Sequence, residues 1–337
     1  MTLDLLRREI GFSTAILKRK PHHLLVQVTN RCNMTCAFCT FPQNAVAPSE
    51  ELTLDEFRKL ATELTGLGRF LISIEGGEPF VRPDLIDIVR ELSRNHLTVL
   101  YTNGWYVTPD KVAALFDAGL TQVGISIDFP DRRHDVKRGL AGAFDRALQA
   151  VKLFRDAVPH GGRQVHIMTV LMKENLHDME ALLQLSASHG VGHAVTLISD
   201  HGPRRGKDRG SLPEGRVTPQ LLDLWKRYPH WRFWSEYLER MDDFISGGPM
   251  PACRAGLESF NIDHVGNVAV CIEKIDRPVG NIRRQSLSQL HAQLIAARDQ
   301  VEGCQSCWTA CRAFGQFTSG GGSLRSWWEL GRRMRSQ

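Results

Sequence analysis

Residues 31–39 read Arg-Cys-Asn-Met-Thr-Cys-Ala-Phe-Cys and follow directly after an apolar stretch. Three residues separate Cys32 from Cys36 and two separate Cys36 from Cys39. Thiolates on one short loop can converge on a single iron–sulfur cluster. Three protein ligands would fill three irons of a cubane and leave the fourth iron open. The open iron could then bind a small chelating ligand and pass it an electron.

A structural zinc site is the main alternative for this loop, but such a site is normally closed by four ligands. No fourth cysteine or histidine lies nearby on the loop. His22 and His23 lie upstream of the predicted strand and are poorly placed to close the site. We therefore expect an iron–sulfur site here rather than zinc or plain buried cysteines.

The composition is that of a globular protein with one large and one smaller domain. The chain has 337 residues, of which 42% are hydrophobic, and a formal net charge of +5. Its densest basic cluster, in residues 204–209, is typical of a solvated loop, so we expect no nucleic-acid partner. We also expect no membrane span and no signal peptide, because no apolar run is long enough for either.

The cysteines are informative about the compartment as well. Eight cysteines without a secretion signal argue against disulfides, and their clustering argues for metal binding. Because exposed thiolates and iron clusters oxidise readily, we expect a reducing, cytoplasmic location.

The first 200 residues alternate between strand-like and helical patterns. Predicted strands cover residues 23–29, 70–75, 98–101, 122–127, 164–172 and 194–199, with helical patterns between them. Continuous apolar strands of this kind indicate a parallel sheet with helical crossovers. The pattern predicts an α/β fold, a partial (β/α)6 barrel that falls short of the eight units of a closed barrel.

After residue 200 the βα rhythm stops. Gly266-Asn267 lies between two strand-like runs and predicts a β-hairpin in the cysteine-rich segment that follows. The dense aromatic residues of 225–237 are typical of core packing. We expect five parts: an N-terminal arm at 1–21, the barrel at 22–200, a linker and bridging helix at 201–250, a cysteine-rich domain at 251–318 and a tail at 319–337.

The cysteine loop after the first strand resembles that of the radical S-adenosylmethionine (SAM) enzymes, and the resemblance covers residues 23 to about 315. Further matching motifs lie at the carboxyl ends of predicted strands, where barrel enzymes place their sites. They are Glu75-Gly76-Gly77-Glu78-Pro79, which corresponds to the family's GGEP motif, Thr102-Asn103-Gly104, and Ser126-Ile127-Asp128 with His134 and Arg138-Gly139 after it.

The resemblance implies a [4Fe–4S] cluster on Cys32, Cys36 and Cys39, whose open iron chelates the amino and carboxylate groups of SAM. Gly76 and Gly77 would let the backbone approach the methionine amino group, although a plain turn is the alternative. Hydroxyl and guanidinium groups suit the SAM carboxylate or ribose, and Phe38 lies beside the adenine or packs in the core. The candidate cofactor-binding residues are Phe38, Gly76, Gly77, Glu78, Asn103, Ser126, Arg138 and Thr169.

Five more cysteines resemble the auxiliary-cluster extensions of the family, called SPASM or twitch: Cys253, Cys271, Cys304, Cys307 and Cys311. Two fully ligated cubanes would need eight protein ligands, so we expect one auxiliary [4Fe–4S] cluster. Similarity to a twitch-type dehydrogenase implies that the first four are its ligands. The end of the SPASM motif resembles Cys307-x3-Cys311, so Cys311 could instead replace one of them. A structural zinc is the alternative.

The resemblance implies reductive cleavage of SAM to a 5′-deoxyadenosyl radical, which abstracts a hydrogen atom from the substrate. Our first hypothesis is oxidation or rearrangement of a small polar metabolite, such as a sugar, cyclitol or nucleoside, in natural-product biosynthesis. A reductant such as flavodoxin or ferredoxin would supply the electron. The alternatives are modification of a ribosomal peptide and a non-enzymatic iron–sulfur or zinc redox sensor.

Two features bear on these alternatives. Barely twenty residues precede the first predicted strand, so we expect no leader-binding domain for a peptide. A sensor would not need the cofactor motifs.

A net oxidation would require a base near the substrate, for which we identify no catalytic residue. His166, His193, Asp200 and His201 lie near predicted strand ends.

Overall fold

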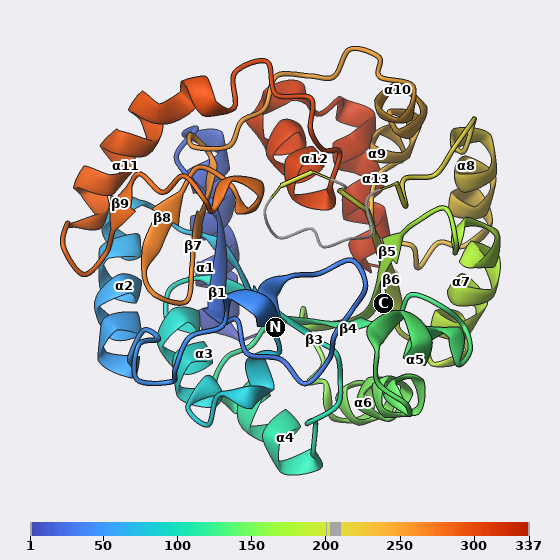
Figure 1. Cartoon of the computed structure of the whole chain (residues 1–337), viewed down its shortest axis with the longest axis horizontal. Coiled ribbons are helices and arrows are strands. Elements are labelled where there is room, and N and C mark those ends of the chain that lie inside the picture. Colours follow the sequence, from blue (N-terminus) through green and yellow to red (C-terminus); the bar gives the residue numbers. More distant parts are fainter. Residues whose placement is uncertain (1, 200, 203–209, 336–337) are drawn as a thin grey trace.

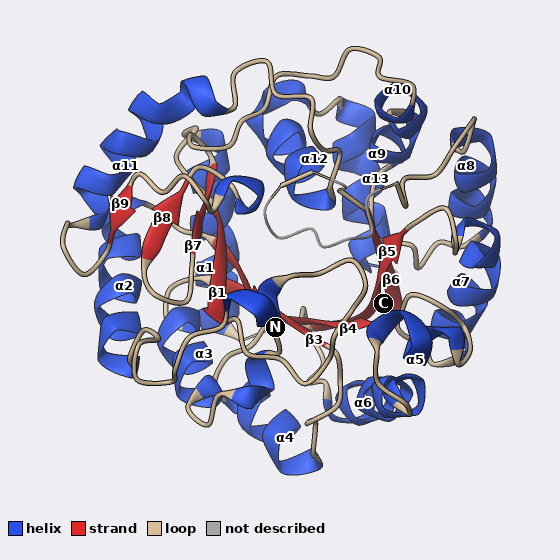
Figure 2. Cartoon of the chain, in the orientation of Figure 1, coloured by secondary structure: helices blue, strands red, loops and turns tan. Residues whose placement is uncertain are grey.

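The computed structural model describes residues 2–199, 201–202 and 210–335 (Figure 1). The basic cluster at 204–209 and Asp200 lie outside the described residues. A nine-stranded sheet forms the centre, in the order β6-β5-β4-β3-β2-β1-β7-β8-β9. It curves into an arc, and helices cover its outer side (Figures 1 and 2). Within the described residues, no helix combines the length and apolar character needed to cross a bilayer.

The predicted open barrel of six parallel strands is confirmed. Its strands are β1 (His23–Thr29), β2 (Leu71–Gly76), β3 (Leu97–Thr102), β4 (Gln122–Ser126), β5 (Gln164–Leu171) and β6 (Gly192–Leu197). Each strand pairs in parallel with the next one along the chain. The helices between them are α2 (Leu54–Leu67), α3 (Leu85–Ser93), α4 (Pro109–Asp117), α5 (Arg133–Arg138), α6 (Ala143–Ala157) and α7 (Met179–Ser188).

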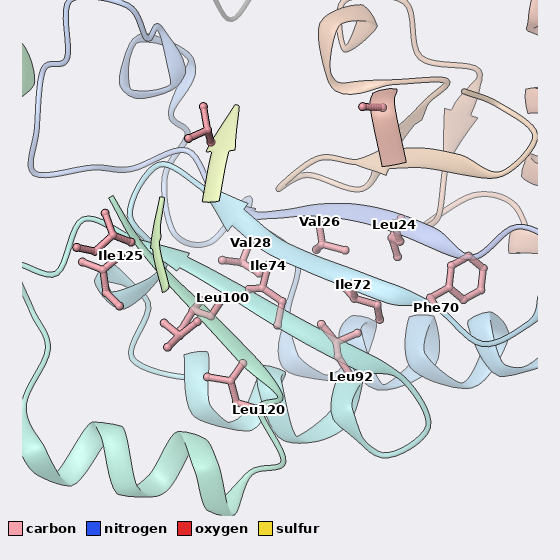
Figure 3. Packing of buried hydrophobic residues seen from close by; sticks show 14 of the residues in the cluster. Leu24, Val26, Val28, Phe70, Ile72, Ile74, Leu92, Leu100, Leu120 and Ile125 are labelled. Carbon is pink, nitrogen blue, oxygen red and sulfur yellow. The ribbon is translucent and has the colours of Figure 1, made fainter. Parts of the chain in front are cut away.

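The two faces of the barrel strands differ in chemistry. Successive side chains of a strand point to opposite faces. On β1, Leu24, Val26 and Val28 are fully buried among the apolar residues that pack the strands against the helices (Figure 3). The alternate residues His23 and Leu25 line a cavity on the inner face. Each buried aliphatic side chain contributes about 1.5–3 kcal/mol, so the outer face holds the sheet and leaves the inner face for function.

The N-terminal arm is a helix, α1 (Leu3–Leu17), which packs against the barrel. Its buried Arg8 donates hydrogen bonds to three backbone carbonyls, of Ser93 at 2.9 Å, His96 at 3.3 Å and Gly119 at 3.0 Å. These carbonyls precede β3 and β4, so α1 lies at the N-terminal ends of the strands, opposite the cysteine loop.

The predicted hairpin is present, but it continues the barrel sheet. β7 (Ser259–Ile262) pairs in parallel with β1, in the register His23 to Ser259. β8 (Asn267–Ala269) and β9 (Gly280–Asn281) then add antiparallel strands. The cysteine-rich segment and the barrel therefore share one sheet.

The C-terminal part also reaches the other edge of the arc. There α12 (Ala310–Gln316) contacts β6, and the Ala310 amide donates a hydrogen bond to Thr196 Oγ1 at 3.1 Å. Figures 1 and 2 show α12 across the opening between the two ends of the arc. The remaining helices are α8 (Thr218–Arg227), α9 (Ser235–Glu239), α10 (Met241–Ile245), α11 (Leu287–Ala296) and α13 (Leu324–Arg335), the last of which occupies most of the expected tail.

The end of β2 approaches the loop after β1 so closely that two positions require glycine. Gly76 has a φ of +133°, and a Cβ there would lie 2.1 Å from the Thr29 carbonyl oxygen. A Cβ on Gly77 would lie 2.3 Å from the Arg31 carbonyl oxygen. The Gly77 amide also donates a hydrogen bond to the Thr29 carbonyl at 2.7 Å. This contact fixes the start of the cysteine loop.

We predict that Gly77→Ala lowers the free energy of unfolding by about 1–3 kcal/mol, because the added methyl group must displace backbone. Gly66→Ala is the matched control. It lies in α2 with nothing within 4 Å of the added Cβ, so it should be neutral or stabilising. Urea denaturation of the two variants would measure the difference. Equal stabilities would contradict the close approach.

Candidate functional site

The arc encloses a cavity of about 620 Å³. All six barrel strands, β1 to β6, contribute to its lining, and the C-terminal part adds Ile272, Thr309, Cys311 and Phe314. The volume is in the range of cofactor and small-molecule sites. The barrel alone does not complete this site, since the wall across the opening comes from the C-terminal part.

The loop after β1 places Cys32, Cys36 and Cys39 in the cavity wall as free, partly buried thiols. Burial, together with the charges of Glu78 and of the other two cysteines, raises the pKa of Cys32 to about 12. The three sulfurs thus lie near one another. Within the described residues, no three His, Cys, Asp or Glu side chains lie close enough to hold a single metal ion. The thiols suit a cluster of several irons, which spaces its ligands more widely than one zinc ion does.

A cation lies beside this loop. Arg138 pairs with Asp128 at 2.7 Å (Nη2 to Oδ2), and its guanidinium carbon lies 5.3 Å from the centre of the Phe38 ring. Burial raises the pKa of the Cys36 thiol, whereas the positive charge of Arg138 opposes this rise. Asp128, which the sequence showed only as part of a motif, therefore orients the arginine next to the cysteine loop.

Glu78 is buried behind the cavity wall and does not line it. Its carboxylate accepts hydrogen bonds from the backbone amide of Asn103 at 2.7 Å, from Thr102 Oγ1 at 2.8 Å and from the backbone amide of Phe80 at 3.1 Å. Burial raises its pKa to about 7. The structure thus gives Glu78 a positioning role, in which it holds the end of β3 against the end of β2.

The other predicted cofactor residues divide by the direction of their side chains. Asn103 lines the cavity, and its Nδ2 donates to Asn33 Oδ1 at 2.9 Å. Thr169 does not line the cavity, because its hydroxyl points into the wall and donates to the Ile127 carbonyl at 2.6 Å. The predicted residues that do line the cavity are Phe38, Gly76, Gly77, Asn103, Ser126 and Arg138.

The five C-terminal cysteines separate into two places. Burial raises the pKa of Cys271 strongly, and the thiolates of Cys307 and Cys253 add to the rise. Cys304 likewise adds to the raised pKa of Cys253, so these four sulfurs lie in one neighbourhood. Cys311 lines the barrel cavity instead, with its Sγ 3.8 Å from His23 Nδ1.

Of the candidate bases, only His166 lines the cavity among the residues that the structure describes. His193 is fully buried on β6, and His201 is exposed. Sequence reasoning missed Arg232, which also lines the cavity and donates to His166 Nδ1 at 2.8 Å. No motif marks Arg232, which is one of two arginines within the aromatic segment 225–237.

Curated relatives share only part of their length with this chain. An AdoMet-dependent heme synthase of Methanosarcina barkeri is 33% identical over 173 residues, 51% of this chain and 48% of that protein. A GTP 3′,8-cyclase of Erythrobacter litoralis is 35% identical over 214 residues, 61% and 60% of the two chains. A PqqA peptide cyclase of Bradyrhizobium diazoefficiens is 31% identical over 176 residues, 52% and 45%. The chain thus spans about half to three fifths of these relatives.

The fold is shared with solved structures. Native anSMEcpe with bound AdoMet and Cp18Cys peptide has a TM-score of 0.63 at 14% identity, over 94% of this chain and 95% of that one. At this identity the likeness concerns the fold alone, an open partial barrel.

Two family models match the chain. The Radical SAM superfamily model covers residues 26–186, which contain the cysteine loop and the glycine motif, and the SPASM iron–sulfur cluster-binding domain covers residues 253–308. These matches imply a [4Fe–4S] cluster and SAM as cofactors, together with auxiliary iron–sulfur binding. We conclude that the chain belongs to the radical SAM superfamily and has a C-terminal SPASM iron–sulfur domain.

Proposed function

We propose that this protein is an enzyme that reductively cleaves SAM and acts on a substrate held in the barrel cavity. The single observation that supports this most is that Cys32, Cys36 and Cys39 share one cavity with Gly76 and Gly77. When bound, the cluster and SAM supply an electron and a 5′-deoxyadenosyl radical that abstracts a hydrogen atom. A redox sensor would have no use for such a cavity beside its cluster.

The side chains around the loop have distinct tasks in this proposal. Cys32, Cys36 and Cys39 hold the cluster and leave one iron for SAM. Arg138 offsets the negative charge of the thiolates, and Phe38 provides an aromatic face under the guanidinium and toward the adenine. The side-chain amide of Asn103 and the hydroxyl of Ser126 line the cavity and offer hydrogen bonds to the polar groups of SAM.

We assign one auxiliary [4Fe–4S] cluster to Cys253, Cys271, Cys304 and Cys307. Arg312 supports this choice, because its Nη1 and Nη2 each donate at 2.8 Å, to the Cys307 and Pro251 carbonyls respectively. It thereby ties together two of the three segments that present the thiols and places a positive charge near them. A fully ligated cluster cannot bind substrate, but it can accept an electron in a net oxidation.

The substrate we favour is a small polar metabolite that is oxidised or rearranged. The cavity of about 620 Å³ must hold SAM as well as the reacting part of the substrate, which keeps that part small. Modification of a ribosomal peptide is the alternative, favoured by the similarity to a protein named PqqA peptide cyclase. A flavodoxin or ferredoxin would act as the reductant, and the oxygen sensitivity of the clusters suits a cytoplasmic location.

The first test uses protein reconstituted with iron and sulfide under anaerobic conditions. Addition of SAM should change the electron paramagnetic resonance spectrum of the reduced protein, and dithionite should then release 5′-deoxyadenosine, measured by chromatography. The triple variant of Cys32, Cys36 and Cys39 to Ala should lose both signals, because no site for the first cluster remains. Release of no 5′-deoxyadenosine from the intact, iron-loaded protein would contradict the proposed activity and favour a sensor.

The second test separates Cys311 from the auxiliary ligands by iron content. Two four-iron clusters predict about eight irons per chain in the intact protein and about four in Cys307→Ala. Cys311→Ala is the matched control and should keep all of its iron, because its sulfur lies in the barrel cavity. Iron loss from Cys311→Ala with full retention by Cys307→Ala would reverse the assignment.

A further inference from the structure

The barrel cavity contains a second arginine, Arg232, at the end away from the cysteine loop. Its backbone amide donates to the His193 carbonyl at 2.8 Å, which ties this segment to the edge of β6. Its side chain reaches across to Gln122 and Gln164, the first residues of β4 and β5. The cysteine loop follows the opposite, C-terminal end of β1. The guanidinium therefore lies deep in the barrel, where a substrate could reach it beyond the SAM site.

Among the residues that the structure describes, the hydrogen-bond acceptors of this guanidinium are neutral. Nη1 donates to His166 Nδ1 at 2.8 Å, and Nη2 donates to Gln122 Oε1 at 3.2 Å and to Gln164 Oε1. Because an arginine can only donate, Nδ1 of His166 must be the unprotonated nitrogen. Burial lowers the pKa of His166 well below its usual range, so the imidazole carries no charge.

Arg232 differs in this respect from the other cavity arginine. Arg138 is paired with Asp128. Within the part of the chain that the structure describes, no carboxylate lies within ion-pair distance of Arg232, and the nearby Tyr101 is a neutral phenol at neutral pH because burial raises its pKa. Burial lowers the pKa of Arg232 to about 10, so the guanidinium still carries its charge at neutral pH. A charge removed from water without a partner is costly, and an anionic ligand would remove that cost.

The surroundings also indicate which anion fits. A guanidinium has five N–H donors, of which the three bonds above use three, so two remain for a ligand. One positive charge among neutral neighbours matches a single negative charge, whereas a phosphate dianion would keep one charge unpaired. Carboxylates are the monoanions that guanidinium groups bind best in proteins. Leu97, Val99 and Ala194 line the cavity as well and would contact an apolar body.

We propose that Arg232 binds a carboxylate of the substrate, held in place for this by His166 and Gln122, and that the substrate is a small carboxylic acid. This inference rests on the proposed function, because it names the substrate class of the same cavity. The residue acts as a specificity determinant: it would select acids over their neutral analogues and fix the depth at which the substrate enters the barrel.

The experiment uses a probe pair of the same shape, benzoate and benzamide, titrated into the anaerobic, cluster-loaded protein with SAM present. Isothermal titration calorimetry should show benzoate binding at least about tenfold more tightly than benzamide, since only the acid pairs with the guanidinium. Arg232→Gln should weaken benzoate binding by about tenfold or more, and Arg232→Lys should retain part of it. Arg133→Gln is the matched control and should bind benzoate as the parent does, since Arg133 pairs with Asp131 and Asp178 outside the cavity.

Three results would overturn the inference: no benzoate binding by the parent protein, equal binding of acid and amide, or undiminished binding by Arg232→Gln. The comparison of acid with amide in the parent protein needs no variant, so a folding defect in Arg232→Gln would not leave the question open. Failure of the proposed function would appear separately, as the absence of 5′-deoxyadenosine from the parent protein. The two outcomes are distinguishable: carboxylate binding can be absent while SAM is still cleaved, and SAM cleavage can be absent while the carboxylate still binds.

Discussion

Strand β1 is the element on which the rest of the structure depends, because it joins the strands of the barrel to those of the C-terminal part. β2 lies on one side of it and β7, more than two hundred residues later in the chain, on the other. The cysteine loop leaves the C-terminal end of β1, and the glycines at the end of β2 pack against the backbone of that loop. Any shift of β1 would therefore move the cysteines, the glycine motif and the start of the C-terminal part together.

The inner face of the sheet can carry functional side chains because the apolar outer face holds the sheet against the helices. Leu24, Val26 and Val28 secure β1 against the helices, so His23 on the other face is free to line the cavity. The two arginines that line the cavity differ in their partners. Near the cysteine loop, Arg138 is paired with Asp128, whereas at the far end the hydrogen-bond acceptors of Arg232 among the described residues are neutral. The first arrangement orients a cation beside a cluster, and the second leaves a cation for an incoming acid.

Much of the fold could be predicted because buried parallel strands appear in the sequence as continuous apolar runs, and turn residues mark their ends. The motifs at the strand ends were located for the same reason. The pairing of β7 with β1 could not be predicted, since nothing in a local pattern names the partner of a strand so distant in sequence. Side-chain direction was the other gap. Thr169 alternates with Met168 and Val170, and it is these neighbours that face the cavity.

The C-terminal cysteines also show that spacing in the sequence does not reveal which side chains share a site. Sequence spacing grouped Cys311 with Cys307, but Cys311 at the start of α12 lines the barrel cavity, whereas Cys307, four positions earlier, lies near Cys253 and Cys304. No local pattern marked Arg232 as a site residue. Its hydrogen-bond partners are Gln122 and Gln164, the first residues of β4 and β5, which lie more than sixty residues away in the sequence.

The short connection between Cys307 and Cys311 has a consequence for redox chemistry. If the auxiliary cluster is bound through Cys307, five consecutive residues span the distance from its ligand to the wall that faces the substrate. An electron removed from the substrate would then have a covalent route out of the barrel within a single segment of chain. Oxidised product and stored charge would be separated inside one molecule, before any external carrier docks.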